Sequence, residues 1–229
     1  MKTYAFIFAR GGSKGIPFKN TRLLNGKPLL AWSIEIARDI SEIKQVFVST
    51  DNLEIAAIAR EWKAEVIDRP PELAQDDTPE WLAWQHAVKW LEETGDHFDV
   101  FISLPPTSPL RSKDDVLNCL IKLDKKCDIV VTMTETTRSP WFNMVRIKKD
   151  ESLSLLLEGN YVRRQDVLEA FDMTTVAYVT RPSFILNHER IWDGCVQGVL
   201  IPPERAIDID TVFDFQIAEY FYKKNNNLS

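Results

Sequence analysis

The chain has 229 residues, of which 45% are hydrophobic and 27% are charged, and its formal net charge at pH 7 is −6. This length suits a single domain with a substantial core, and the acidic balance argues against a general nucleic-acid-binding protein, which needs a basic face. After Met1-Lys2 the apolar run is too short for a signal peptide, and no run approaches the length that spans a bilayer. We therefore expect a cytoplasmic protein with no nucleic-acid or membrane partner.

The three cysteines and three histidines suggest no catalytic dyad and no metal centre of their own. Cys119, Cys127 and Cys195 are odd in number and do not have the spacing of a zinc site. They are typical of reduced thiols in a cytosolic protein.

Predicted strands and helices alternate along the first 133 residues. Apolar runs predict strands at 4–9, 46–48, 65–67, 99–104 and 129–133, and apolar periodicity predicts helices at 28–39, 53–62, 79–94 and 112–126. Asp51 with Glu54 resembles a capping box, and Thr78-Pro79 is typical of an N-cap followed by a first-turn proline. The alternation predicts parallel βαβ crossovers and hence an α/β fold with a doubly wound, mostly parallel, Rossmann-like sheet.

The alternation of strands and helices stops between Thr134 and about Asp172. Short hairpin-like pieces at 141–148, 153–157 and 161–164 follow one another without a clear crossover helix. We expect a single domain over residues 1–229 with an inserted arm at about 138–173; a surface excursion over a sheet edge is the simpler alternative. Strands at 175–180 and 199–201 and a helix at 211–224 complete the chain.

The loop after the first strand combines glycines with cations. Gly11, Gly12 and Gly15 allow backbone N–H groups to point inward, and Arg10, Lys14, Lys19 and Arg22 lie in or beside the turn. Such a nest binds polyphosphate, although an ordinary tight turn with solvated charges is the alternative. The spacing fits neither the Walker pattern nor the dinucleotide fingerprint.

Two carboxylates near the end of the chain are candidate metal ligands. Asp208 and Asp210 are two residues apart, so in an extended segment their side chains share one face, while Ile207 and Ile209 turn to the other. Such a pair can hold Mg²⁺ together with substrate phosphates. The alternative is that Asp210 caps the last helix and Asp208 is exposed.

Two further groups of donors are candidates for binding a sugar or an acid. Pro106-Thr-Ser-Pro-Leu-Arg111 follows a predicted parallel strand at the edge where open α/β sheets bind ligands, and Ser108 and Arg111 are hydrogen-bond donors. Arg163-Arg164-Gln165 lies in the predicted arm. Taken alone, the first is more typical of a turn before a capped helix, and the second of a solvated surface.

Together these motifs resemble the acylneuraminate cytidylyltransferase family, which makes CMP-sialic acid and CMP-activated nonulosonic acids. The matching pieces keep the family's order over nearly the whole chain: Ala9-Arg-Gly-Gly-Ser-Lys-Gly15 with Lys19-Asn20, Val48-Ser-Thr-Asp51, Arg69-Pro70, Glu72-Leu-Ala74 with Asp77-Thr78, Pro106 to Arg111, Arg164-Gln165 and Ile207 to Asp210. The resemblance implies an enzyme that transfers CMP from CTP to the anomeric hydroxyl of a nonulosonic acid and releases pyrophosphate, with Mg²⁺ as cofactor. It also implies a homodimer in which the arm reaches the partner's site.

The resemblance also assigns roles by position. It implies nucleotide binding by Ala9, Arg10, Gly11, Gly12, Ser13, Lys14, Lys19, Asn20, Arg69, Asp77 and Thr78; sugar binding by Ser108, Arg111, Arg164, Gln165 and Tyr178; metal binding by Asp208 and Asp210; and catalysis by Arg10, Lys14, Asp208 and Asp210. Asp208 is also the implied acceptor of the sugar's proton.

The chain departs from the sialic acid enzymes in the part implied to bind the sugar. Pro105 stands where many of them have glutamine, and Trp192 is the nearest aromatic to a missing phenylalanine pair. A legionaminic, pseudaminic or related nonulosonate therefore fits the sequence as the acceptor sugar equally well as N-acetylneuraminate does. The alternatives are another sugar nucleotidyltransferase, forming CMP-Kdo or an NDP-hexose, and a non-catalytic nucleotide-binding protein of the same fold.

Overall fold

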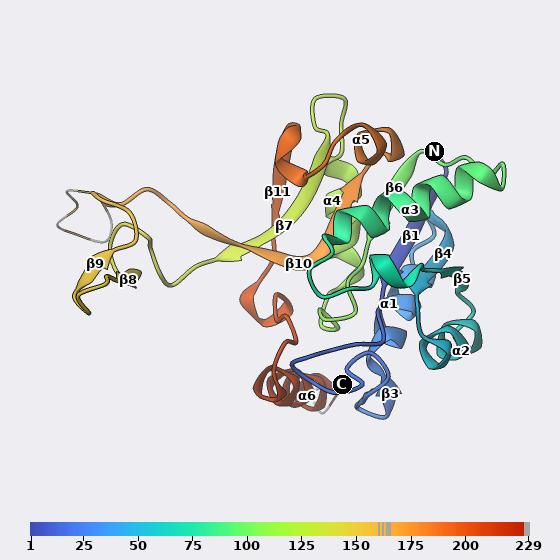
Figure 1. Ribbon diagram of the computed structural model, residues 1–229, viewed down its shortest axis with the longest axis horizontal. Helices are drawn as coiled ribbons and strands as arrows, with labels where there is room; N and C mark the ends of the chain where they lie inside the picture. Colours follow the sequence, from blue (N-terminus) through green and yellow to red (C-terminus); the bar gives the residue numbers. More distant parts are fainter. Residues whose placement is uncertain (160, 162, 164–165, 227–229) are drawn as a thin grey trace.

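A computed structural model of the chain describes residues 1–159, 161, 163 and 166–226, with side chains up to residue 224. Seven strands form one sheet in the order β11-β7-β10-β6-β1-β4-β5 (Figure 1). Their bounds are Thr3–Phe8 (β1), Ile43–Thr50 (β4), Glu65–Asp68 (β5), Val100–Ser103 (β6), Ile129–Glu135 (β7), Phe171–Thr180 (β10) and Val196–Leu200 (β11). The predicted doubly wound, mostly parallel α/β fold is confirmed.

One strand of the sheet runs against the others. β10 pairs antiparallel with both β6 and β7, whereas β1 pairs parallel with β4 and β6, β4 with β5, and β7 with β11. β10 also begins at Phe171, opposite Glu135, and so is longer than the predicted strand at 175–180. Its direction follows from the arm, because the chain leaves the body along β7 and returns beside it along β10 (Figure 1).

Side chains alternate along each strand and bury both faces of the sheet. On β1, Ala5 and Ile7 join the core beneath α1 (Leu29–Arg38), α2 (Leu53–Glu61) and α4 (Lys113–Lys122). Tyr4, Phe6 and Phe8 face the other way, into an aromatic core covered by α3 (Glu80–Glu93) and α5 (Pro182–Asn187). Burial on both faces explains why the central strands are continuous apolar runs in the sequence.

A third, smaller core joins the two ends of the chain. Ile16, Leu24 and Leu29 pack with Ile209, Phe215 and Ala218. Here α6 (Val212–Asn226) lies beside the small hairpin of β2 (Leu23–Leu24) and β3 (Lys27–Pro28) (Figure 1). This packing holds the residues just before α6 against the glycine loop.

The helix starts correct two of the predicted caps. Asn52 is the N-cap of α2, because its side chain accepts hydrogen bonds from the N–H groups of Glu54 and Ile55. The N-cap position of α3 is Pro79, without a side-chain cap, and the Thr78 hydroxyl donates to the carbonyl of Glu72 instead. At the start of α4, Ser112 and Asp115 form a capping box.

The segment between β7 and β10 extends away from the body of the molecule (Figure 1). β8 (Val145–Ile147) and β9 (Leu153–Leu155) pair antiparallel in a separate small sheet, close to the hairpin predicted there. The third predicted piece, 161–164, falls partly outside the described residues. Within the portion of the chain that is described, no helix is both long and apolar enough to cross a membrane.

Candidate active site

The glycine-rich loop leaves the carboxyl end of β1 and is braced by the next strand. The N–H group of Gly11 donates to Asp51 Oδ1 over 2.9 Å, and that of Ala9 donates to the carbonyl of Ser49 over 3.1 Å. Asn20 closes the loop on itself, because its Nδ2 donates to the carbonyl of Arg10 over 3.0 Å. Asp51, which the sequence predicted as a helix cap, therefore fixes the loop.

Lys19 and Gly15 connect this loop to the predicted metal pair. Lys19 Nζ donates to the carbonyl of Ile209 over 2.8 Å and contacts Asp210 Oδ1 at 3.1 Å. Gly15 lies so close to the same segment that an added Cβ would be 2.2 Å from the Asp210 carbonyl oxygen. Residues nearly two hundred positions apart thus form one wall of the site.

Arg10 and Lys14 are both paired with a carboxylate that the sequence analysis did not select. Asp76 Oδ1 lies 2.5 Å from Arg10 Nη1, and Asp76 Oδ2 lies 2.6 Å from Lys14 Nζ. Hydrogen bonds from Lys14 and then Arg10 hold the pKa of the Asp76 carboxyl below its usual range. The resemblance implied nucleotide binding by the neighbouring Asp77, and which of the two adjacent aspartates reaches the glycine loop depends on how the connection folds.

A cavity of about 310 Å³ opens over the glycine loop. Its wall includes five of the residues expected at the nucleotide, Arg10, Ser13, Lys14, Lys19 and Asn20, together with the Pro105–Thr107 turn and the carboxylates of Glu80 and Asp210. An anion entering it would meet three cationic side chains and the backbone of the loop, as the sequence analysis expected for polyphosphate. Gly12 lies on the loop with open space around it.

Arg69 lies behind the loop and supports it. The side chain is buried, its Nε donates to Ser49 Oγ over 3.1 Å, and its Nη2 donates to the carbonyl of Ser49 over 2.7 Å. The guanidinium also lies over the Phe8 ring, 5.5 Å from its centroid. Burial lowers the pKa of Arg69, and the positive charge of Arg10 acts in the same direction.

A second cavity, of about 360 Å³, adjoins the first and is more aromatic. The two share Glu80 and Pro105, and the second is walled by Trp81, Trp84, Tyr178 and Trp192. Tyr178, which was expected to contact the sugar, lines this second cavity, and burial raises its pKa to about 12. Its hydroxyl remains neutral at physiological pH and is able to donate a hydrogen bond.

Glu80 is a site residue that sequence reasoning missed. It lines both cavities, and its carboxylate accepts a hydrogen bond from Trp84 Nε1 over 2.8 Å. Although the residue borders the open cavities, the protein around its carboxyl group raises its pKa. In the sequence it is an ordinary first-turn acidic residue, and only the folded chain places it between two pockets.

Asp210 lines the first cavity, and Asp208 lies two residues before it and is less exposed. Asp210 is exposed, whereas Oδ1 of Asp208 is buried and has no hydrogen-bond partner in the described part of the protein. Burial raises the pKa of Asp208, and the charge of Asp210 acts in the same direction. Ile209 between them is fully buried, as the alternation predicted.

Asp210 is not the cap of the last helix. Thr211 and Asp214 cap α6 reciprocally, with the Thr211 N–H donating to Asp214 Oδ2 over 2.7 Å. Among the described residues no cluster of three or more acidic, histidine or cysteine side chains is arranged to hold a metal ion. A cation at Asp208 and Asp210 would need further oxygen ligands from water or substrate.

Ser108 and Arg111, expected at the sugar, lie buried beneath the cavities instead. Arg111 donates from Nε to the carbonyl of Val176 over 2.7 Å, from Nη1 to Ser33 Oγ over 2.5 Å, and from Nη2 to the carbonyl of Pro105. Burial lowers the pKa of Arg111 to about 9. Ser108 Oγ shares a hydrogen bond with Thr175 Oγ1. The side-chain polar groups of both residues are hydrogen-bonded within the protein, and Arg111 fixes the Pro105–Thr107 turn through its bond to Pro105.

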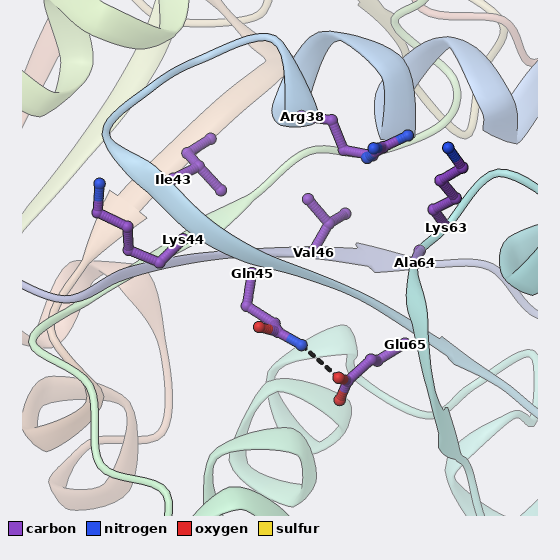
Figure 2. Close-up of a pocket in the computed structure, with 8 residues that line it drawn as sticks. All are labelled: Arg38, Ile43, Lys44, Gln45, Val46, Lys63, Ala64 and Glu65. Atoms are coloured by element: carbon purple, nitrogen blue, oxygen red, sulfur yellow. Dashed lines mark hydrogen bonds between the residues drawn. The ribbon is translucent and has the colours of Figure 1, made fainter.

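The remaining expected sugar ligands, Arg164 and Gln165, lie outside the described residues. A separate pocket, of about 420 Å³, lies at the opposite edge of the sheet, where β4 and β5 begin (Figure 2). Arg38, Lys44 and Lys63 surround it with their charged ends exposed, and Gln45 binds Glu65 across it (Figure 2). It is remote from the glycine loop and belongs to neither of the two cavities above.

A cationic glycine loop at the carboxyl end of β1, in contact with the segment that carries Asp208 and Asp210, lies where open α/β sheets bind nucleotides. The family model described as "Cytidylyltransferase" matches residues 4–227, and the chain belongs to this family.

Two curated relatives match this chain over nearly its whole length. The chain is 33% identical to "Post-translational flagellin modification protein B" of Campylobacter coli over 224 residues, and 32% identical to "CMP-N,N'-diacetyllegionaminic acid synthase" of Campylobacter jejuni over 227 residues. Each alignment covers 96% of this chain and 94% of the relative. A solved structure of "CMP:2-keto-3-deoxy-manno-octonic acid synthetase" with CTP has the same fold, with a TM-score of 0.73 at 16% identity, over 98% of this chain and all of that one.

Substituting Gly15 tests the contact between the loop and Asp210. Gly15→Ala places a methyl group against the backbone of Asp210, so we expect a loss of about 1–3 kcal/mol in the free energy of unfolding, measured by denaturant titration. Gly12→Ala is the matched control, because its added methyl group meets nothing within 4 Å. Equal effects of the two substitutions on stability would contradict the close approach.

Proposed function

We propose that the protein transfers CMP from CTP to the anomeric hydroxyl of a nonulosonic sugar acid and releases pyrophosphate. The observation that carries this proposal is the pair of adjoining cavities, one cationic and one aromatic, that share Glu80 and Pro105. The relatives named above include an enzyme that makes a CMP-activated sugar acid of this class, and a relative 27% identical is named "Pseudaminic acid cytidylyltransferase". We place the reaction in the cytoplasm, where nucleoside triphosphates are made.

The cationic cavity suits the triphosphate. In this role Arg10, Lys14 and Lys19 neutralise the phosphates, and the N–H groups of the glycine loop contact their oxygens. Transfer of the nucleotidyl group needs the sugar oxygen in line with the departing pyrophosphate, so positioning and charge neutralisation supply most of the catalysis. Lys19 is suited to fixing that geometry, since Ile209 and Asp210 hold its ammonium group.

The aromatic cavity suits the acceptor. Its tryptophans and Tyr178 offer apolar surface to a sugar ring and its acyl groups, and the shared wall brings an acceptor there next to the nucleotide. Asp208 is suited to take the proton of the anomeric hydroxyl, because its carboxyl group contacts Thr107 on the wall of the cationic cavity and Thr175 on the wall of the aromatic one.

The residues present fit a magnesium ion. The buried Oδ1 of Asp208 has no partner among the residues described, and Asp210 carries a second carboxylate on the cavity wall. Mg²⁺ accepts one or two carboxylates with substrate phosphates and water, and when bound it would supply positive charge to the triphosphate. We propose that Asp208 and Asp210 hold it.

The acceptor and the nucleotide can be tested in one assay of pyrophosphate release. We expect turnover with CTP and at least one nonulosonate from a panel of N-acetylneuraminate, diacetyllegionaminate and pseudaminate, and none with ATP, GTP or UTP, because the cavity is proposed to select CTP. Turnover with Kdo or a hexose phosphate alone would favour another sugar nucleotidyltransferase. CTP binding by calorimetry without turnover on any acceptor would favour a non-catalytic protein.

Metal removal tests the carboxylate pair. Chelation should abolish pyrophosphate release, and Mg²⁺ should restore it. Asp210→Asn should raise the Mg²⁺ concentration needed for half-maximal rate about tenfold or more, because half of the proposed ligand charge is lost. Glu204→Gln removes an exposed carboxylate from the same segment and should leave the Mg²⁺ dependence unchanged. An unchanged dependence in Asp210→Asn contradicts its role as a ligand.

We also propose a homodimer formed through the arm. Val145, Ile147 and Leu153 are 54%, 76% and 61% exposed on the small β8–β9 sheet, which is more apolar surface than an isolated hairpin keeps in water. Light scattering at micromolar concentration should give twice the chain mass, and Ile147→Asp should give the monomer mass. Ile121→Asp, on α4 and 80% exposed, is the control expected to remain dimeric. A monomeric parent protein contradicts the proposal.

A further inference from the structure

The Asp76 carboxylate lies between two cations of the glycine loop, in the way that a phosphate group would. One oxygen contacts Arg10 Nη1 at 2.5 Å, and the other contacts Lys14 Nζ at 2.6 Å. Both cations lie on the wall of the cavity to which the triphosphate is assigned. The carboxylate oxygens stand in for the non-bridging oxygens of a phosphate, since both groups are compact anions that accept from guanidinium and ammonium groups.

Asp76 belongs to a connection that touches the glycine loop through few side chains. The segment runs from the short helix Pro71–Leu73 to the start of α3. It is tied internally, because Thr78 Oγ1 donates to the carbonyl of Glu72 and Gln75 Nε2 donates to the carbonyl of Pro71, each over 3.0 Å. Its side-chain contacts to the glycine loop are the two ion pairs and a longer bond, 3.3 Å, from Arg10 Nη1 to the carbonyl of Ala74.

These ion pairs are of the kind that a stronger anion displaces. The side chains of Asp76 and Lys14 are 43% and 77% exposed, so solvent screens their attraction. A triphosphate offers more negative charge and more acceptor oxygens to the same two cations than one carboxylate does. Arg10 and Lys14 cannot turn their full set of donors to phosphate oxygens while Asp76 remains between them.

We propose that Asp76 is an internal anion that pairs with Arg10 and Lys14 in the nucleotide-free protein and is displaced by the triphosphate, so that it sets the affinity for the nucleotide. The identification of the ligand rests on the proposed function. Two effects follow from the geometry. Asp76 keeps the two cations poised over the loop, and it lowers the apparent affinity for any polyphosphate that must first displace it. Because the displacement is complete when the nucleotide is bound, it acts on binding and not on the rate of the bound complex.

Replacing Asp76 with an uncharged isostere tests this competition. Calorimetric titration of CTP and of inorganic pyrophosphate, at fixed Mg²⁺ and ionic strength, should show about three- to tenfold tighter binding to Asp76→Asn, the range given by two exposed ion pairs. With the acceptor saturating, KM for CTP should fall by a similar factor while kcat stays within about twofold. Thermal unfolding establishes that the variant is folded.

Glu72→Gln is the matched control, because it removes the same charge from the same connection. The exposed Glu72 side chain makes no hydrogen bond or ion pair with the described part of the chain, so its loss should leave both affinities unchanged. Equal tightening in both variants would assign the effect to overall charge and overturn the proposal. Unchanged or weaker binding in Asp76→Asn would also overturn it, and weaker binding would mean that Asp76 supports the bound state.

The pyrophosphate arm separates this inference from the proposed reaction. If the parent protein turns over no acceptor and yet pyrophosphate binds more tightly to Asp76→Asn, the proposed function fails and the internal anion stands. If the parent protein turns over CTP and the affinities for pyrophosphate and CTP do not change in the variant, the inference fails and the proposed function stands.

Discussion

The contact between the glycine loop and the Ile207–Asp210 segment is the constraint on which the rest of the site depends. Lys19 spans it with hydrogen bonds to Ile209 and Asp210, and the absence of a side chain at Gly15 allows the two backbones to meet. Ile16 and Ile209 pack in one small core behind it. Loss of this contact would leave the cations of the loop without a fixed distance to Asp208 and Asp210. The third core therefore stabilises the site, because its residues come from both segments.

A buried arginine plays the corresponding part on the other side of the site. Arg111 joins α1 at Ser33, β10 at Val176 and the turn at Pro105, and Pro105 forms part of the wall shared by the two cavities. A guanidinium is suited to this because its donors fan out in a plane and reach three separate segments. Burying the charge is costly, and its three acceptors offset much of that cost. The position of the turn between the two cavities is thereby set from beneath.

Much of the fold could be predicted from periodicity, because strands buried on both faces and amphipathic helices leave strong local signals. The elements β1, α1, α2, β5, α3, β6 and β7 are close to their predicted bounds, whereas β4 is longer and α4 shorter than predicted and the β2–β3 hairpin was not predicted. The direction of β10 could not be predicted in this way, because it depends on where the arm returns to the sheet. Nor could the short helix α5, whose six residues carry too little periodicity to distinguish it from a loop.

The residues of the candidate site also differ in whether local sequence features mark them or whether their role depends on a distant partner. The glycine loop and the Asp208–Asp210 pair could be selected as candidates from the sequence because the features that mark them are local, and the structure brings the two segments into contact. Asp51, Asp76, Glu80 and Arg111 could not be placed correctly, because each acquires its role from a partner at least four residues away, and in most cases far along the chain. A carboxylate beside a helix start looks the same in sequence whether it caps that helix, as Asp51 was expected to do, or holds a loop 40 residues away.

The cations of the site differ in how firmly their partners hold them, and this gives a physical reason for separate roles. The Lys19 side chain is 13% exposed and is bound to backbone as well as to Asp210, so its ammonium group is fixed whether or not an anion is present. Lys14 is 77% exposed, and its described ion pair is to an aspartate on a surface connection. A protein of net charge −6 attracts an anion poorly at long range. An anion site on such a protein depends on cations clustered at the site itself, and here Asp76 partly neutralises two of them. In the proposed displacement, Lys19 supplies the fixed geometry, and Arg10 and Lys14 supply charge that becomes available when a stronger anion replaces Asp76.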